Sequence, residues 1–173
     1  VIGDPSIFNL LKGLPEINNK KEVNKDILIK IIKKSVAIKA RVVALDEKEK
    51  GLRAILNYGH TFGHVLENLC GYGTLLHGEA VALGMVAIGE LAVQCDFWSK
   101  EESDLQKNLI AKMGLPIVWP EFEFEKIMQS LHGDKKVEDG KVRFIVPRRI
   151  GEVEIRNDIT EQQISRTIDR LIN

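Results

Sequence analysis

The chain has 173 residues with 25 basic and 25 acidic side chains, so its formal net charge is zero. That length suits one domain with a substantial core. The neutral balance gives no electrostatic reason to expect nucleic acid or an anionic membrane surface as a partner. Cys70 and Cys95 lack the Cys-x-x-Cys spacing and are expected to be reduced thiols of a cytoplasmic protein. The most apolar stretch, 80–93, is too short to span a bilayer.

Two helices are predicted in the first 45 residues. Asp4, followed by a proline, is typical of a helix start, and Gly13 can end that helix. After a polar linker from Leu14 to Val23, Asn24 can cap a long helix that runs from about Lys25 to Val43 or beyond. Its apolar residues follow the helical period: Leu28, Ile31, Ile32, Val36, Ala40 and Val43. Lys30, Lys33 and Lys34 lie off this stripe and are expected to face solvent, whereas Lys39 and Arg41 sit among apolar neighbours.

The middle of the chain predicts a pair of closely packed helices. Asn57 is placed to cap a helix that Gly71 can close. A second helix, from about Leu76 to Cys95, is apolar on nearly all sides and rich in glycine and alanine. Because glycine weakens a helix, its frequent use here indicates close approach of neighbouring backbones. We expect this second helix to be central to the domain.

The last third of the chain changes from helix to strand and back. Ser99 opens a capping box and a helix to about Met113, and Pro120 is expected to open another, to about Leu131. Alternating segments at 142–146 and 152–155, separated by Pro147 to Gly151, predict a small β-hairpin. Thr160 with Gln163 can cap a final helix to Ile172. The predicted fold class is therefore mainly α, multi-helical with one small β-hairpin.

Three of the four histidines lie between residues 60 and 77. His60 and His64 are four apart and share one face of a helix, and His77 follows a glycine-flanked turn. Such a pair by itself can be an ordinary surface or core feature, but the third histidine favours a metal site, an acid/base site, or both. The helical metalloprotease motif is excluded, because it needs Glu directly after the first histidine and Thr61 stands there.

Three segments carry a resemblance to a known family. The run from Asp46 to His64 (DEKEKGLRAILNYGHTFGH), the run from Leu76 to Ala82 (LHGEAVA) and Asp134 to Val137 resemble the signature of 3-dehydroquinate synthase, an enzyme of the shikimate pathway that leads to chorismate and the aromatic amino acids. The resemblance extends from about residue 3 to residue 155. The wider sugar-phosphate cyclase superfamily shares much of this signature.

The resemblance implies that residues 1–173 are only the C-terminal helical, metal- and substrate-binding domain. The family enzyme is about twice as long and begins with an NAD-binding α/β domain. This chain contains no Gly-x-Gly-x-x-Gly and no βαβ alternation, so no cofactor-binding residue is expected in it. In the family, a glutamate that binds zinc lies just upstream of the position of Val1. We therefore expect a fragment that is inactive alone and whose full-length form is a homodimer.

The implied activity is that of an NAD- and zinc-dependent, phosphate-eliminating carbon–oxygen lyase. It converts 3-deoxy-D-arabino-heptulosonate 7-phosphate to 3-dehydroquinate and phosphate. His60 and His77 match the ligands of Zn²⁺ (or Co²⁺), His64 matches a residue that contacts substrate and transfers a proton, and Glu49 matches a general base. The residues expected to bind substrate are Lys39, Arg53, Asn57, His64, Lys135 and Lys136.

Two other functions stay open at this stage. One is a related sugar-phosphate cyclase, of the 2-deoxy-scyllo-inosose synthase type. The other is a non-catalytic helical binding or assembly module that carries histidines, and its lack of retained zinc would distinguish it. Glu79 is interpreted as a residue that orients a histidine or packs at an interface, in preference to a third metal ligand, and Glu67 is open in the same way.

Overall fold

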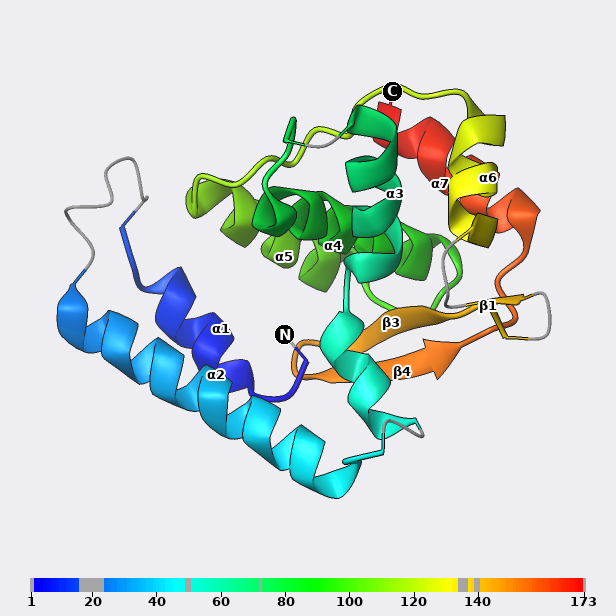
Figure 1. Cartoon of the computed structure of the whole chain (residues 1–173). Helices are drawn as coiled ribbons and strands as arrows, with labels where there is room; N and C mark the ends of the chain where they lie inside the picture. The colour runs from blue at the N-terminus through cyan, green and yellow to red at the C-terminus, as the bar shows by residue number, and fades with distance from the viewer. Residues whose placement is uncertain are drawn as a thin grey trace.

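Helices make up most of the structure, a computed structural model that describes residues 2–15, 24–48, 51–71, 73–133, 137–138 and 141–172 (Figure 1). The mainly α fold with a small hairpin is confirmed. The helical elements are α1 (Pro5–Lys12), α2 (Lys25–Leu45), the 3₁₀ helix η2 (Leu52–Asn57), α3 (His60–Cys70), α4 (His77–Gln94), α5 (Lys100–Lys112), α6 (Phe124–Gly133) and α7 (Glu161–Ile172).

Helices α1 and α2 lie side by side and form what we call the α1–α2 arm, coloured from blue to cyan in Figure 1. Both begin at the predicted caps. The Asp4 carboxylate accepts a hydrogen bond from the Ser6 amide at 2.8 Å, and the Asn24 side chain accepts one from the Asp26 amide at 2.9 Å. Each cap satisfies an amide that the first turn of the helix would otherwise leave without a partner.

Much of the apolar stripe that the sequence shows on α2 is exposed, although Ile31 and Val43 are partly buried. Val42 is the buried residue of this helix, whereas Leu28, Ile32 and Val36 are 43%, 52% and 62% exposed. Among the described residues, the main neighbours of α2 are α1 and η2. The spacing of the apolar residues predicts that this segment is a helix. Because α2 has apolar residues on more than one side, the spacing does not show which side packs against the rest of the protein.

Helices α3 and α4 pack closely at the centre of the fold, as their glycine content predicts. A Cβ added at Gly84 would overlap the carbonyl oxygen of Gly59 and lie 2.8 Å from the amide nitrogen of Gly63. The predicted cap, however, is wrong: Asn57 ends η2, and α3 begins at His60 after Gly59, whose φ of +80° suits glycine. Gly71 ends α3 as predicted.

The remaining helices close the core around α4. Ser99 caps α5, since its hydroxyl accepts from the Glu102 amide at 3.2 Å, and Thr160 pairs with Gln163 at the start of α7. Helix α6 begins at Phe124, four residues later than predicted from Pro120. Trp119, which directly precedes Pro120, is buried, and its ring centroid lies 5.7 Å from that of Phe62.

Two small antiparallel ladders lie beside the helices. Strands β3 (Phe144–Arg149) and β4 (Glu152–Arg156) form the predicted hairpin, with Ile145 opposite Ile155. The prediction placed Val142 in this hairpin, but Val142 belongs to β2 (Lys141–Val142), which pairs with β1 (Val137–Glu138). Pro147 lies within β3, at a register shift, and not in the turn. None of the described helices has the length and apolar character that a membrane span requires.

Candidate metal and substrate site

Three histidine rings converge where α3 meets α4. His60 is the first residue of α3, His64 lies one turn later, and His77 is the first residue of α4. The ring centroids are 5.3 Å apart for His60 and His77, 5.7 Å for His60 and His64, and 6.4 Å for His64 and His77. The close packing of the two helices, which depends on Gly59, Gly63 and Gly84, produces this convergence.

The separation of His60 and His77 suits two ligands of one metal ion. Zinc binds imidazole nitrogen at about 2.0–2.1 Å, so two tetrahedral histidine ligands have ring centroids about 5 Å apart. The observed 5.3 Å agrees with this value, and the 6.4 Å between His64 and His77 is too long for the same arrangement. Within the described part of the chain, no group of three or more His, Cys, Asp or Glu is arranged to hold a metal ion.

Both rings of this pair use Nδ1 for a contact within the protein. His60 Nδ1 lies 3.2 Å from the carbonyl oxygen of Tyr58, and His77 Nδ1 lies 2.9 Å from Oε1 of Glu67. Glu67 follows His60 by seven residues and His64 by three, so all three share one face of α3. The sequence analysis left the role of Glu67 open. The helical spacing of Glu67 from His60 and His64 was the sequence feature that could have placed it beside the histidines.

A buried hydrogen-bonded chain supports the start of α3. The hydroxyl of Tyr58 donates to Oε1 of Gln106 at 2.7 Å, and Gln106 Nε2 donates to the carbonyl oxygen of Met85 at 2.9 Å. Burial raises the pKa of Tyr58 well above its usual range, so the phenol stays protonated and remains a donor. This chain ties the residues before His60 to α4 and α5.

The hydrogen bond that the structure gives Glu79 is not the contact with a histidine that was one of the two interpretations of the sequence. Its carboxylate accepts a hydrogen bond from the Leu76 amide at 2.8 Å, in a capping box at the start of α4. The carboxylate that contacts His77 is that of Glu67. Glu79 therefore holds the first turn of the helix that begins with His77, and its hydrogen bond is to the backbone and not to a histidine.

The predicted cationic residues lie on the segment that leads into α3 and on α2. Asp46 Oδ2 accepts from the amides of Gly51 and Arg53, both at 2.9 Å, which organises the entry to η2. The Arg53 guanidinium donates to the carbonyl oxygen of Glu47 at 3.4 Å, and Asn57 is partly exposed at the end of η2.

Lys39 is exposed on α2 and lines a small pocket that involves both helices of the α1–α2 arm and η2. That pocket also includes Asp4, Ser35 and Leu56. Leu56 directly precedes Asn57, so Lys39 and Asn57 belong to the same neighbourhood of the fold. Glu49, Lys135 and Lys136, the other predicted catalytic and substrate-binding residues, lie outside the described residues.

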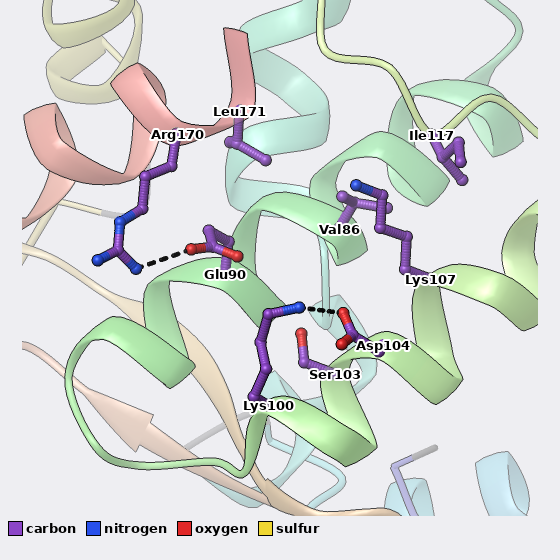
Figure 2. A pocket seen from close by; sticks show the side chains of 9 residues that line it. All are labelled: Val86, Glu90, Lys100, Ser103, Asp104, Lys107, Ile117, Arg170 and Leu171. Carbon is purple, nitrogen blue, oxygen red and sulfur yellow. Dashed lines mark hydrogen bonds and ion pairs between the residues drawn. The ribbon is translucent and has the colours of Figure 1, made fainter. Parts of the chain in front are cut away.

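A second pocket, between α4, α5 and α7, is lined by charges of both signs (Figure 2). There Arg170 donates to Glu90 at 3.1 Å, and Lys100 pairs with Asp104. Glu90 follows His77 by thirteen residues on α4, which is about 20 Å along the helix axis. This pocket is therefore separate from the histidine cluster.

The chain shares its fold with parts of two solved synthases. The chain superposes with a TM-score of 0.85 on ValA, the 2-epi-5-epi-valiolone synthase of Streptomyces hygroscopicus subsp. jinggangensis 5008, solved with NAD⁺ and Zn²⁺ bound, at 23% identity over 98% of this chain and 47% of that one. A 2-deoxy-scyllo-inosose synthase complexed with carbaglucose-6-phosphate, NAD⁺ and Co²⁺ matches with a TM-score of 0.70 at 23% identity, over 95% of this chain and 49% of that one.

The family follows from the sequence matches. Residues 1–137 match the family model described as 3-dehydroquinate synthase C-terminal, and the chain belongs to this family. It is 56% identical over 171 residues to the 3-dehydroquinate synthase of Prochlorococcus marinus strain MIT 9303, which is 99% of this chain and 46% of that protein. The enzyme of Synechococcus sp. strain CC9605 is 52% identical over the same shares. The chain thus spans about half the length of the curated relatives it matches.

Proposed function

We propose that this chain is the metal- and substrate-binding part of a 3-dehydroquinate synthase. The reaction is the conversion of 3-deoxy-D-arabino-heptulosonate 7-phosphate to 3-dehydroquinate with release of phosphate. The observation that carries the proposal is the convergence of His60 and His77, 5.3 Å apart, in a chain of this family. The 56% identity to a curated synthase supports the choice of substrate.

His60 and His77 would hold a Zn²⁺ or Co²⁺ ion through Nε2, because a contact with an acceptor oxygen occupies Nδ1 of each ring. When bound, the metal supplies a Lewis acid for substrate oxygens, and NAD⁺, bound by another part of the enzyme, supplies hydride transfer. The two relatives solved with Zn²⁺ or Co²⁺ share the fold, which supports a metal in this position.

His64 would exchange a proton with substrate. It lies one turn from His60 on the same face of α3, with ring centroids 5.7 Å apart, so it faces the same space. Lys39, Arg53 and Asn57 would bind the anionic and hydroxyl groups of the substrate, since phosphate and carboxylate favour fixed cationic and amide donors. We extend the same roles to Glu49, as general base, and to Lys135 and Lys136, as further substrate cations.

We further infer that the complete enzyme is a cytoplasmic homodimer that acts on a small molecule. The formal net charge of zero gives no electrostatic reason to expect nucleic acid as a partner. A related cyclase that uses another sugar phosphate is the alternative. The fold matches to such cyclases are at 23% identity, whereas the curated 3-dehydroquinate synthases match at 45% to 56%, and this difference favours the synthase.

A chimaeric enzyme tests the proposal. The chain would replace the 171 matched residues of the Prochlorococcus marinus MIT 9303 enzyme, and phosphate release would be measured with NAD⁺ and Zn²⁺. We expect turnover of 3-deoxy-D-arabino-heptulosonate 7-phosphate and none of glucose 6-phosphate. A folded chimaera that releases no phosphate from the first substrate, or that prefers the second, would contradict the proposal.

Two variants of this chimaera separate the roles of the histidines. His60→Ala removes a ligand, so bound zinc and activity should fall together. His64→Ala should keep zinc and lose about 10²- to 10⁴-fold in rate, the usual contribution of a positioned acid or base. Metal analysis beside steady-state kinetics measures both. If His64→Ala loses zinc as fully as His60→Ala, a site of three histidines becomes the better description.

The chain by itself should be inactive and should bind zinc weakly. Two neutral imidazoles are fewer ligands than a catalytic zinc site uses, and they bring no negative charge to balance the metal. Equilibrium dialysis against Zn²⁺ measures this directly. Tight retention of zinc by the chain alone would show that a further ligand lies within it.

A further inference from the structure

The carboxylate of Glu67 contacts the ring of His77. Its Oε1 lies 2.9 Å from His77 Nδ1, and this contact joins α3 to the first residue of α4. We propose that Glu67 is a positioning residue that fixes the tautomer and orientation of His77, with the proton on Nδ1 and the lone pair of Nε2 directed at the metal. This inference rests on the proposed metal site.

The physical reason is the chemistry of the pair. An ionised carboxylate can only accept a hydrogen bond, so the neutral imidazole beside it must carry its proton on Nδ1. Nε2 is then the nitrogen that can bind a metal, and the negative charge makes it a stronger ligand. His77 is 60% exposed, so packing alone does not hold its ring, whereas Glu67 is 34% exposed and sits on a packed helix.

His60 provides an internal reference for this role. Its Nδ1 also meets an acceptor, but that acceptor is the carbonyl oxygen of Tyr58, at 3.2 Å. A substitution at Glu67 leaves this backbone acceptor in place. The tautomer of His77 should therefore depend on Glu67, and the tautomer of His60 should not.

The first test uses the metal-free chain labelled with ¹⁵N. Long-range ¹H–¹⁵N correlation spectra near pH 8, where an ordinary imidazole is neutral, report the tautomer of each histidine. We expect the Nδ1–H form at His77 in the unmodified chain and a shift toward Nε2–H in Glu67→Ala. Glu67→Gln keeps an acceptor oxygen and should preserve the Nδ1–H form.

Glu79→Gln is the matched control, because it neutralises a carboxylate two residues from His77 that contacts the Leu76 amide. It should leave the tautomer of His77 unchanged. An Nε2–H tautomer at His77 in the unmodified chain would overturn the proposal. So would a Glu67→Ala spectrum in which His77 keeps the Nδ1–H form.

Zinc affinity gives the second readout, measured in the chimaera by competition with a chromophoric chelator. Glu67→Ala should weaken zinc binding about 10- to 100-fold, the usual effect of removing a partner of a metal-binding histidine, and Glu67→Gln should weaken it less. Loss of zinc from Glu67→Ala with an unchanged His77 tautomer would overturn the positioning role and identify Glu67 as a ligand. A chimaera that binds no zinc would refute the metal site, while the spectra would still decide what Glu67 does to His77.

Discussion

The contact between helices α3 and α4, which we call the α3–α4 junction, and the α1–α2 arm differ in the exposure of their apolar side chains. Phe62 and Leu66 on α3 and Leu83 on α4 are 0%, 0% and 2% exposed. On α2, Leu28, Ile32 and Val36 are between 43% and 62% exposed, and Val42 is the buried residue. Those three side chains of α3 and α4 lie in the core, whereas most of the length of α2 is covered along one side.

The candidate metal ligands and the candidate substrate-binding residue Lys39 lie in these two different regions. The histidines stand on the junction, where backbone contact between helices fixes the positions of His60 and His77. A metal site needs such support, because ligand positions must be held to within about 0.5 Å. Lys39 stands on the arm, where the structure shows it exposed. Substrate binding by long cationic side chains tolerates a less constrained scaffold.

The largest effect is expected from filling the contact between α3 and α4. Gly84→Ala would place a Cβ against the Gly59 carbonyl oxygen and 2.8 Å from the Gly63 amide nitrogen, where only backbone could move away. We expect the free energy of unfolding to fall by about 3 kcal/mol. Denaturant unfolding monitored by circular dichroism measures it.

Gly78→Ala is the control on the same helix, because a Cβ at Gly78 would meet nothing within 4 Å. Its stability should stay the same or rise by up to about 1 kcal/mol, since alanine favours helix over glycine. Equal losses in the two variants would show that the close approach at Gly84 does not govern the packing of the junction.

A smaller effect is expected from the same substitution on the two sides of α2. Val42→Ala removes two buried methyl groups and should lower the free energy of unfolding by about 2 kcal/mol. Val36→Ala, at a position that is 62% exposed, should change it by less than about 0.5 kcal/mol. The gain in helix propensity is common to both variants, so it cancels in the comparison.

Chemical unfolding of both variants side by side gives the difference directly. A loss at Val36 as large as that at Val42 would mean that the outer face of α2 is covered in solution, and the contrast between arm and junction would then fail.

The smallest effect concerns the cap of α1. The nearby Ser6 hydroxyl and the hydrogen bond from the Ser6 amide, with a further contribution from Lys34, lower the pKa of Asp4 to about 2. An unfolded aspartate has a pKa of about 3.9, so the stabilisation is fully present above that pH and is lost as the pH falls through about 2. Asp4→Asn keeps a good capping side chain without the charge.

Thermal unfolding of the two proteins at pH 6 and pH 3 measures this. The unmodified chain should exceed Asp4→Asn in melting temperature by a small margin at pH 6, and the margin should shrink at pH 3. A margin that grows on acidification would contradict the direction of the pKa shift.

Local chemistry made most helix ends predictable. Asp4, Asn24, Ser99 and Thr160 cap the helices that the sequence assigns to them, because a cap satisfies amides only two or three residues away. The prediction that Asn57 caps the histidine helix was wrong because a contact distant in sequence decides where this helix begins. Gly59, which packs against α4, is the residue before the start of α3.

The sequence by itself determined the family, the helical class and the three histidines, since each is written in neighbouring residues and their spacing. Tertiary structure alone decided which side of α2 is buried, that Val142 pairs with β1, and that Glu67 and not Glu79 contacts His77. The reason is physical. Both glutamates lie near the histidines in sequence, but a carboxylate binds the donor that the folded chain places beside it. For Glu79 that donor is the amide of Leu76, the residue that precedes α4.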